Sequence, residues 1–276
     1  MFEETKVAIM KFGLKYLSFD EVAARNGLYL EKMLLENRLV FGYHQEIVQQ
    51  KKRLKHLEKQ VTDRYGELLK AHLEELVSEI FPGQPGVRAR RQRSAILKLL
   101  TELALRLGQE ISFREIAKIA EIDGKTTKHY LDLLMEARVV FPMQGLGRKG
   151  KKFYFFDCGV RNALINNYNT EANRNDWGLL WENFVIAERI KYKRRRRLGA
   201  EHFYWKTFNK QQVPLIEEKQ GLISAYLLSW SDKPKFSIQF PDSFKRNYPE
   251  AYYQVLQPKN IERFIARKAL PYEIVR

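Results

Sequence analysis

The stretch from Ser94 to Asp157 restricts the fold of this chain more than any other. It holds three successive segments whose apolar residues recur at helical spacing, and these predict helices over residues 94–107, 113–120 and 125–137. The runs VVFPMQ and KKFYFFD follow, and they predict two strands joined by the basic, glycine-rich turn GLGRKGK. Three helices followed by such a hairpin predict a winged helix-turn-helix, whose third helix enters a DNA groove.

Polar residues mark where these helices begin. Ser94 is a candidate N-cap of the first helix, and Ser112 with Glu115 has the spacing of a capping box before the second. The third helix is expected to bury Thr127, Tyr130, Leu131 and Leu134 and to turn Lys125, Lys128, His129 and Asp132 outward. Because Asp132 and Glu136 on the outward face repel phosphates, a helix that only packs against its neighbours is the alternative.

Charge indicates the class of partner. The 276 residues include 49 Lys and Arg against 33 Asp and Glu, and the resulting net charge of +16 favours polyanions. No apolar run approaches the ~20 residues of a membrane-spanning helix, and the N-terminal MFEETK does not resemble a signal peptide. We therefore expect a cytoplasmic protein that binds DNA and no membrane. Cys158 is the only cysteine, which excludes an internal disulfide and a thiolate metal site.

Three groups of basic residues are candidate phosphate contacts. One precedes the first predicted helix of the winged helix, one lies in the hairpin turn and at its end, and one follows a predicted helix over residues 182–193. Each group alone is also explained as a solvated charge run, but the repetition favours contacts that position a protein on DNA without reading its sequence. The residues are Arg88, Arg90, Arg91 and Arg93, then Arg148, Lys149, Lys151 and Lys152, then Arg194, Arg195, Arg196 and Arg197.

The region before the winged helix is mainly helical in pattern. Residues 6–16 predict a strand or strand pair, and the capping-box spacing of Ser18 and Glu21 opens a helix through Ala24. A second helix is predicted over residues 28–36. An apolar stripe from Leu54 to Ile80 predicts one long helix or two, with Gly66 as a possible bend. The run from Pro82 to Gly86 predicts a boundary.

The last third of the chain predicts a small mixed sheet. A helix over residues 181–193 is followed by runs rich in β-branched and aromatic residues, and a helix is predicted near residues 241–246. The tail holds the stretch from Ile261 to Ile265 before PYEIV. The predicted strands are HFYWKTF, QQVPLIEE, GLISAYLL, KFSIQF and AYYQVL.

The order of the motifs LSFDE, TTKHYLDLL, KKFYFFDCGVRNAL, LLWENFV, FYWKT and GLISAYLLSW carries a family resemblance. It resembles the C-terminal two thirds of a bacterial and archaeal AAA+ superfamily ATPase family. In that family an ATPase core precedes a winged helix and a C-terminal domain of unknown function, which is similar to the PD-(D/E)XK nucleases. The resemblance extends from about Leu17 to Leu256, and FYFFDCGVRNAL followed by LLWENFV is its most specific part.

The resemblance implies an α+β multidomain chain. Residues 1–87 would resemble the end of an AAA+ ATPase module, residues 88–158 would form the winged helix-turn-helix, and residues 159–276 a mixed α/β, restriction-endonuclease-like domain. The chain contains no G-x-x-x-x-G-K-[ST], and GLGRKGKK has no hydroxyl residue after its lysine. We therefore expect a truncated relative, or a partner of a separately encoded ATPase, that hydrolyses no ATP alone.

The nuclease-like domain departs from the family at its metal site. A PD-(D/E)XK site needs two carboxylates and a lysine around a divalent cation. The resemblance places Pro214, Leu227 and Ser229 at those positions, which leaves Glu182 as a vestigial carboxylate in an apolar pocket. Glu217 and Glu218 are the nearby replacements, and we interpret them as a surface acidic pair in a turn. No cofactor, no metal and no catalytic residue are expected.

The other candidate ligands do not favour an enzyme either. The histidines are His44, His56, His72, His129 and His202, and none has the spacing of a metal motif. The leading hypothesis is therefore a non-catalytic protein that binds DNA through the winged helix and the basic groups. The alternative is a protein-interaction or regulatory remnant that assembles with itself or with a separate full-length ATPase. The apolar stripe from Leu54 to Ile80 motivates this alternative.

Overall fold

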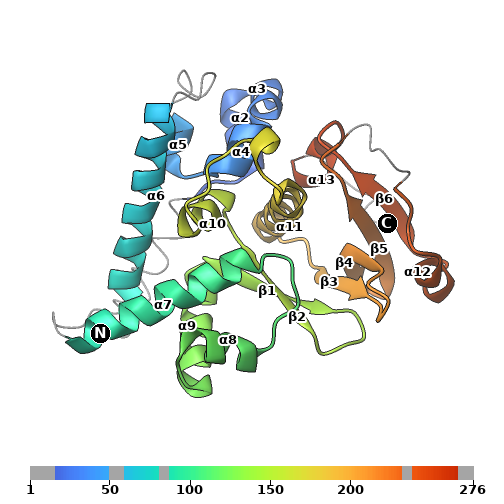
Figure 1. The fold of residues 1–276 in the computed structure, drawn as a ribbon. Helices are drawn as coiled ribbons and strands as arrows, with labels where there is room; N and C mark the ends of the chain where they lie inside the picture. Colours follow the sequence, from blue (N-terminus) through green and yellow to red (C-terminus); the bar gives the residue numbers. More distant parts are fainter. Residues whose placement is uncertain (1–15, 50–58, 81–86, 232–237, 267–276) are drawn as a thin grey trace.

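The structure, a computed structural model, describes residues 16–49, 59–80, 87–231 and 238–266 (Figure 1). In these residues α-helices accompany one mixed sheet, so the predicted α+β class is confirmed. The N-terminal helices are α2 (Phe19–Asn26), α3 (Leu28–Met33), α4 (Leu35–Phe41), α5 (Gln45–Gln49) and α6 (Lys59–Ile80). Residues 6–15 of the first predicted strand and the predicted boundary at residues 82–86 lie outside the described residues.

Three helices and a hairpin occupy the middle of the chain. They are α7 (Val87–Leu105), α8 (Phe113–Ala120), α9 (Gly124–Glu136), β1 (Val140–Gly145) and β2 (Lys151–Phe155). The predicted capping box before α8 is present, because Ser112 Oγ accepts from the Glu115 backbone and the Glu115 carboxylate accepts from the Ser112 backbone. The predicted start of the first helix at Ser94 is wrong, since α7 begins at Val87 and continues through a run of helix-favouring arginines.

The C-terminal part alternates helices and strands. It comprises α10 (Cys158–Leu164), a 3₁₀ turn η1 (Glu171–Asn173), α11 (Trp177–Arg196), β3 (Glu201–Lys206), β4 (Gln212–Lys219), β5 (Leu222–Leu228), α12 (Asp242–Asn247), β6 (Tyr252–Leu256) and α13 (Glu262–Ile265). Four of the five predicted strands are therefore confirmed. The predicted strand KFSIQF is not, because its described residues 238–240 are irregular.

The hairpin is part of the C-terminal sheet. The strand order is β2-β1-β3-β4-β5-β6, and β1 pairs with β3 in parallel through Gln144 opposite Phe203 and Gly145 opposite Tyr204. The β5–β6 pair is also parallel, and the other neighbouring strands are antiparallel. Strands on both sides of the predicted boundary at residue 158 thus share one sheet.

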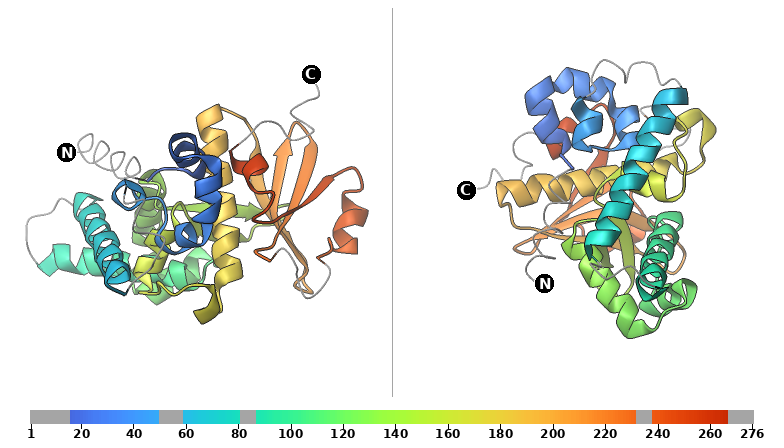
Figure 2. Two further views of the ribbon diagram at one scale, coloured as in Figure 1. Left: turned by 90° about the horizontal axis from the view of Figure 1, so that it is seen from above. Right: turned by 90° about the vertical axis from the view of Figure 1, so that its left-hand side faces the viewer.

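Helix α11 forms the centre of the fold. It runs between the N-terminal helices and strands β3–β6 (Figure 2) and contacts α4 and α10 as well as β2 and β5. Its burial extends around the helix, and Trp181 and Phe184 join a large core that continues from the N-terminal helices to the sheet. A smaller core, which includes Trp205 and Phe244, lies under α12. No helix within the described ranges, α11 included, is long and apolar enough to span a membrane.

The segment FYFFDCGVRNAL acts as a junction between these parts. Asn162 Nδ2 donates to the carbonyls of Leu39 at 2.9 Å and Val40 at 2.8 Å, which holds α10 against α4. Asn183 on α11 accepts from the Phe155 amide at 2.8 Å and donates to the Phe155 carbonyl at 3.0 Å. Its side-chain amide therefore pairs with the edge of β2 as a neighbouring strand would. The side-chain amides of Asn162 and Asn183 thus pair buried backbone groups and hold neighbouring elements together. This structural role explains why the motif contains them.

Candidate nucleic-acid interface

The first group of predicted phosphate contacts lies on the opening turns of α7 instead of in a loop. Arg88 belongs to the first of these turns, Arg90 and Arg91 are exposed, and Arg93 is half-buried. The first turn of α7 contains no acidic residue. Cationic side chains at this end oppose the partial positive charge of a helix N-terminus, so a phosphate bound here would relieve that repulsion.

Helix α9 has the two faces that its sequence predicts. Thr127, Tyr130, Leu131 and Leu134 are buried, whereas Lys125, Lys128, His129 and Asp132 are exposed. Lys128 Nζ lies 2.8 Å from Asp132 Oδ2, one helical turn away. An exposed pair of this kind contributes little stability, so Lys128 is able to exchange the carboxylate for a phosphate.

The hairpin turn divides its basic residues between the sheet and the solvent. Arg148 Nη1 donates to the Lys206 carbonyl at 2.9 Å, and Arg148 Nη2 lies 3.5 Å from a Glu110 carboxylate oxygen. Lys149 is exposed and Lys151 is half-exposed. Lys149 and Lys151 are therefore the two residues of this group that are open to an external anion without first giving up an internal contact with a carboxylate.

Lys152 is not a surface cation, and its prediction as a phosphate contact is wrong. Its side chain is 1% exposed, and its Nζ lies 3.8 Å from Glu182 Oε1 and 3.3 Å from Gln212 Oε1. Tyr154 donates to the same Glu182 oxygen at 2.6 Å. Burial lowers the pKa of Lys152, and Glu182 opposes that shift. An ammonium group and a phenol thus surround Glu182, which corrects the expectation of an apolar pocket.

The arginines at the end of α11 are not equivalent. Arg195 is directed to α2, where its guanidinium pairs with Asp20 and Glu21. Arg194, Arg196 and Arg197 are exposed, and Arg197 ends the helix in the left-handed conformation with φ of 54°. Three of the four predicted residues therefore remain open to a partner.

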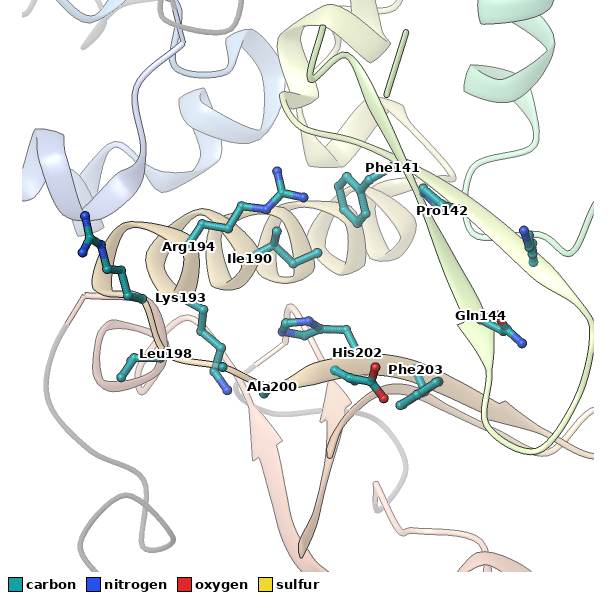
Figure 3. Close-up of a pocket in the computed structure, with 14 residues that line it drawn as sticks. Phe141, Pro142, Gln144, Ile190, Lys193, Arg194, Leu198, Ala200, His202 and Phe203 are labelled. Atoms are coloured by element: carbon teal, nitrogen blue, oxygen red, sulfur yellow. The ribbon is translucent and has the colours of Figure 1, made fainter. Parts of the chain in front are cut away.

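A pocket of about 770 Å³ brings the second and third basic groups together (Figure 3). It lies between β1, the end of α11 and the start of β3, and Figure 3 shows Arg194 and His202 on opposite sides of it. Glu201 is the carboxylate among its lining residues. Its basic lining residues, which we call the basic groove, are Lys151, Lys193, Arg194, Arg197 and His202.

A buried charge cluster forms the floor of the basic groove. Arg189 donates to both oxygens of Glu217, at 2.8 and 2.9 Å, and Lys193 Nζ lies 2.9 Å from the same carboxylate. His202 Nε2 is 3.2 Å from Glu217 Oε1. Burial raises the pKa of Glu217, but the Arg189 charge, the hydrogen bonds from His202 and Arg189 and the Lys193 charge together hold that pKa well below its usual range. Arg189 and Lys193 thus share the Glu217 carboxylate at the floor of the groove.

This arrangement corrects the interpretation of Glu217 as part of a surface turn. Glu217 lies inside β4 and is 1% exposed, while Glu218 is half-buried at the strand end. Sequence reasoning missed Arg189 and Lys193 as its partners. Both lie on α11, four residues apart, and no local signal distinguishes them from the exposed cations that follow on the same helix.

The nuclease-like positions do not converge on Glu182. Leu227 belongs to the smaller core with Trp205, whereas its neighbour Tyr226 belongs to the large core with Trp181. Successive residues on a strand point to opposite faces, so Leu227 faces away from α11. Pro214 is buried in β4, and Ser229 donates to the Ser231 carbonyl at 3.1 Å. Leu227 and Glu182 therefore lie on opposite faces of the sheet.

The comparisons with known proteins place the chain in one family. Residues 33–171 match the family described as Domain of unknown function (DUF8612). The chain belongs to the DUF8612 family. The DUF8612 match includes α4 to α10 with the hairpin, and it ends before α11, so only Lys151 of the basic groove falls within it. The searches of curated proteins and of solved structures found no match.

Proposed function

We propose that this chain is a non-catalytic nucleic-acid-binding protein that holds duplex DNA through a winged helix-turn-helix and the adjoining basic groove. In this proposal α7, α8 and α9 are the three helices, α9 is the recognition helix, and β1 with β2 is the wing. The observation that supports it most is the basic groove itself. Lys151 from the proposed wing and Arg194 and Arg197 from α11 line one pocket although they are distant in sequence.

The electrostatics of the groove suit a phosphate backbone. A concave surface on which basic side chains outnumber acidic ones concentrates the field and attracts polyanions from solution. Lys193 both lines the groove and pairs with Glu217, which joins the buried cluster to the groove surface. Contacts with phosphates position a protein on DNA and supply salt-dependent affinity, while base contacts would come from Lys125 and Lys128 on α9.

The non-catalytic part of the proposal rests on the surroundings of Glu182. Lys152 and Tyr154 occupy the space next to its carboxylate, and Leu227 lies on the other face of the sheet. A single carboxylate beside an ammonium group is unsuited to holding a catalytic divalent cation. We accordingly propose that residues 159–276 are a degenerate PD-(D/E)XK-like domain that contributes its basic end to DNA binding.

Fluorescence anisotropy with a labelled duplex tests the proposal. The triple variant Lys151→Glu, Arg194→Glu, Arg197→Glu is compared with Lys210→Glu, Lys245→Glu, Arg246→Glu, which changes the net charge equally at exposed sites outside the groove. The groove variant should bind about tenfold or more weakly, and its log-log salt slope should fall by about 0.9 for each phosphate that it no longer neutralises. Equal weakening in the two variants, or no duplex binding by the native chain at low salt, would overturn the proposal.

A second candidate function, assembly with itself or with a separate ATPase subunit, has a different basis. The described part of the predicted apolar stripe packs inside the chain, because Tyr65, Leu69 and Leu73 are buried. Helix α3 instead exposes Tyr29 and Met33, one turn apart. If this pair is the interface, Tyr29→Ser with Met33→Ser should convert an oligomer to a monomer in sedimentation velocity, and a native monomer argues against it.

A further inference from the structure

Two buried histidines meet between α5 and α6, outside the basic groove. His44 immediately precedes α5, Glu46 lies in its first turn, and His72 lies on α6. One ligand atom from each of these three residues falls within 4.8 Å of the other two. We propose that His44, Glu46 and His72 bind a borderline divalent transition-metal ion, with Zn²⁺ as the preferred ion.

The distances suit an ion of this size. The imidazole rings of His44 and His72 have centroids 4.0 Å apart and are tilted by 44°. His72 Nε2 lies 3.8 Å from Glu46 Oε1. Two ligand atoms at about 2.0–2.2 Å from Zn²⁺ stand between roughly 3.3 and 4 Å apart. An ion therefore fits between His72 Nε2 and Glu46 Oε1. The ligand atom of His44 lies within 4.8 Å of both, and the His44 ring, which now contacts the His72 ring, must turn away from it before both imidazoles bind one ion.

A fourth residue lies beside one of the ligands. His72 Nδ1 lies 3.3 Å from Glu75 Oε2, on the next turn of the same helix. In metal sites a carboxylate commonly accepts the proton of one ring nitrogen, which fixes the tautomer and leaves the lone pair of the other nitrogen for the metal. The approach is not a hydrogen bond as it stands, and a small rotation of Glu75 would let it accept the Nδ1 proton and leave the Nε2 lone pair of His72 for an ion beside Glu46.

Burial explains how the site would be both anchored and accessible. His44 is 1% exposed and His72 is nearly buried, while the Glu46 and Glu75 carboxylates reach solvent. The imidazoles are thus held by the core, and the open side offers an entry path and a position for a water ligand. Two imidazoles and one carboxylate favour Zn²⁺, Co²⁺ or Ni²⁺ over Mg²⁺ and Ca²⁺, which prefer all-oxygen sites.

Binding here would connect the start of α5 to α6. The two elements are separated by residues 50–58 in the chain, and a shared ion would restrict their separation in partly unfolded states. The consequence is a protein whose N-terminal helices are more stable with metal than without it. This effect is independent of DNA binding, so each proposal can fail without the other.

Cobalt binding to metal-free, tag-free protein tests the site. We expect one Co²⁺ per chain with visible d–d absorption bands, displacement by Zn²⁺, and a higher melting temperature with Zn²⁺ than with a chelator. Glu46→Gln and His72→Gln should each weaken the affinity about tenfold or more. The matched controls are Glu74→Gln on α6 and His129→Gln on α9, both exposed residues outside the cluster, and these should bind as the native chain does.

Glu46 is exposed, so its variant keeps the fold and tests the ligand set directly. Absence of stoichiometric Co²⁺ binding to the native chain would overturn the proposal. Native-like affinity in Glu46→Gln and in His72→Gln would also overturn it, because the ion would then lie elsewhere.

Discussion

The backbone N–H of Tyr43 donates to Asp157 Oδ2 over 2.7 Å in the buried interior. The other carboxylate oxygen of Asp157 accepts from the amides of Gly159 at 2.8 Å and Val160 at 3.2 Å, which caps α10. One side chain therefore satisfies three backbone donors and connects the N-terminal helices to the end of the hairpin.

Replacement of Asp157 by Ala should lower the free energy of unfolding by about 2–4 kcal/mol, because it leaves three amides without their acceptor in the core. Urea denaturation monitored by circular dichroism measures the change. Asp123→Ala is the matched control, since Asp123 caps α9 through two amides at the surface and should cost about 1 kcal/mol. Equal destabilisation in the two variants would contradict a special role for Asp157.

Gly159 is constrained by the same junction. A Cβ at this position would lie 2.2 Å from the Phe41 carbonyl oxygen, whereas a Cβ at Gly178 in the first turns of α11 would have no neighbour within 4 Å. Gly159→Ala should therefore destabilise the protein by about 1–3 kcal/mol through overpacking. Gly178→Ala should stabilise it by up to about 1 kcal/mol through helix propensity. Thermal melts of the two variants that shift in the same direction would contradict this expectation.

Glu217 should make stability depend on acid pH. Although burial raises its pKa, Arg189 holds that pKa well below the usual range, so the ion pairs stabilise the fold above the unfolded carboxyl pKa of about 4.3 and are lost as pH falls further. Glu217→Gln removes the carboxylate opposite Arg189 and Lys193 and should cost about 3–5 kcal/mol at neutral pH. The difference from the native chain should shrink below about pH 4.3. A pH-independent difference in urea denaturation would refute the assignment.

The proposed wing and the proposed recognition helix should respond differently to charge reversal. Glutamate at Arg148, Lys149 and Lys151 should weaken binding uniformly across DNA sequences, because phosphate contacts carry no base information. Glutamate at Lys125 and Lys128 should change the order of preferred sequences instead. Binding of each variant to a randomised duplex library, followed by sequencing, separates the two. Identical behaviour would show that α9 serves only for packing.

Divalent metal should not convert the chain into a nuclease. Lys152 Nζ lies 3.8 Å from Glu182 Oε1, and Glu182 belongs to no cluster of three potential metal ligands within the described part of the chain. Supercoiled plasmid incubated with the purified protein and Mn²⁺ over a range of pH should remain intact. Nicking that requires Mn²⁺ and disappears in Glu182→Ala would overturn this expectation and the non-catalytic part of the proposed function.

Patterns formed by residues close together in the sequence predict the helix starts and helix faces that depend on those same residues. The capping boxes at Ser18 and Ser112 mark helix starts because each involves residues only three positions apart. The faces of α9 follow from helical periodicity in the same way. The start of α7 could not be placed, because Ser94 resembles an N-cap while the arginines before it also favour helix.

The side-chain environments depend on tertiary packing and are harder to predict. The basic neighbours of Lys152 indicate a solvent-exposed side chain, but it lies against Glu182 because α11 covers β2. The basic groove joins Lys151 to Arg194 through the β1–β3 pairing and the packing of α11 against β2, which no local pattern encodes. His44 and His72 likewise come together through the packing of α5 near α6, so their spacing in the sequence carries no metal motif.

The parallel β1–β3 pairing has a mechanical consequence. Because the hairpin is hydrogen-bonded into the same sheet as β4, β5 and β6, it cannot pivot separately from α11, which packs on that sheet. A rigid surface of this kind loses little conformational entropy when it docks, and it cannot follow a flexible partner. If the proposed function holds, any adjustment of shape falls on the duplex, and sequences that bend readily toward the groove are held more tightly than stiff ones of equal charge.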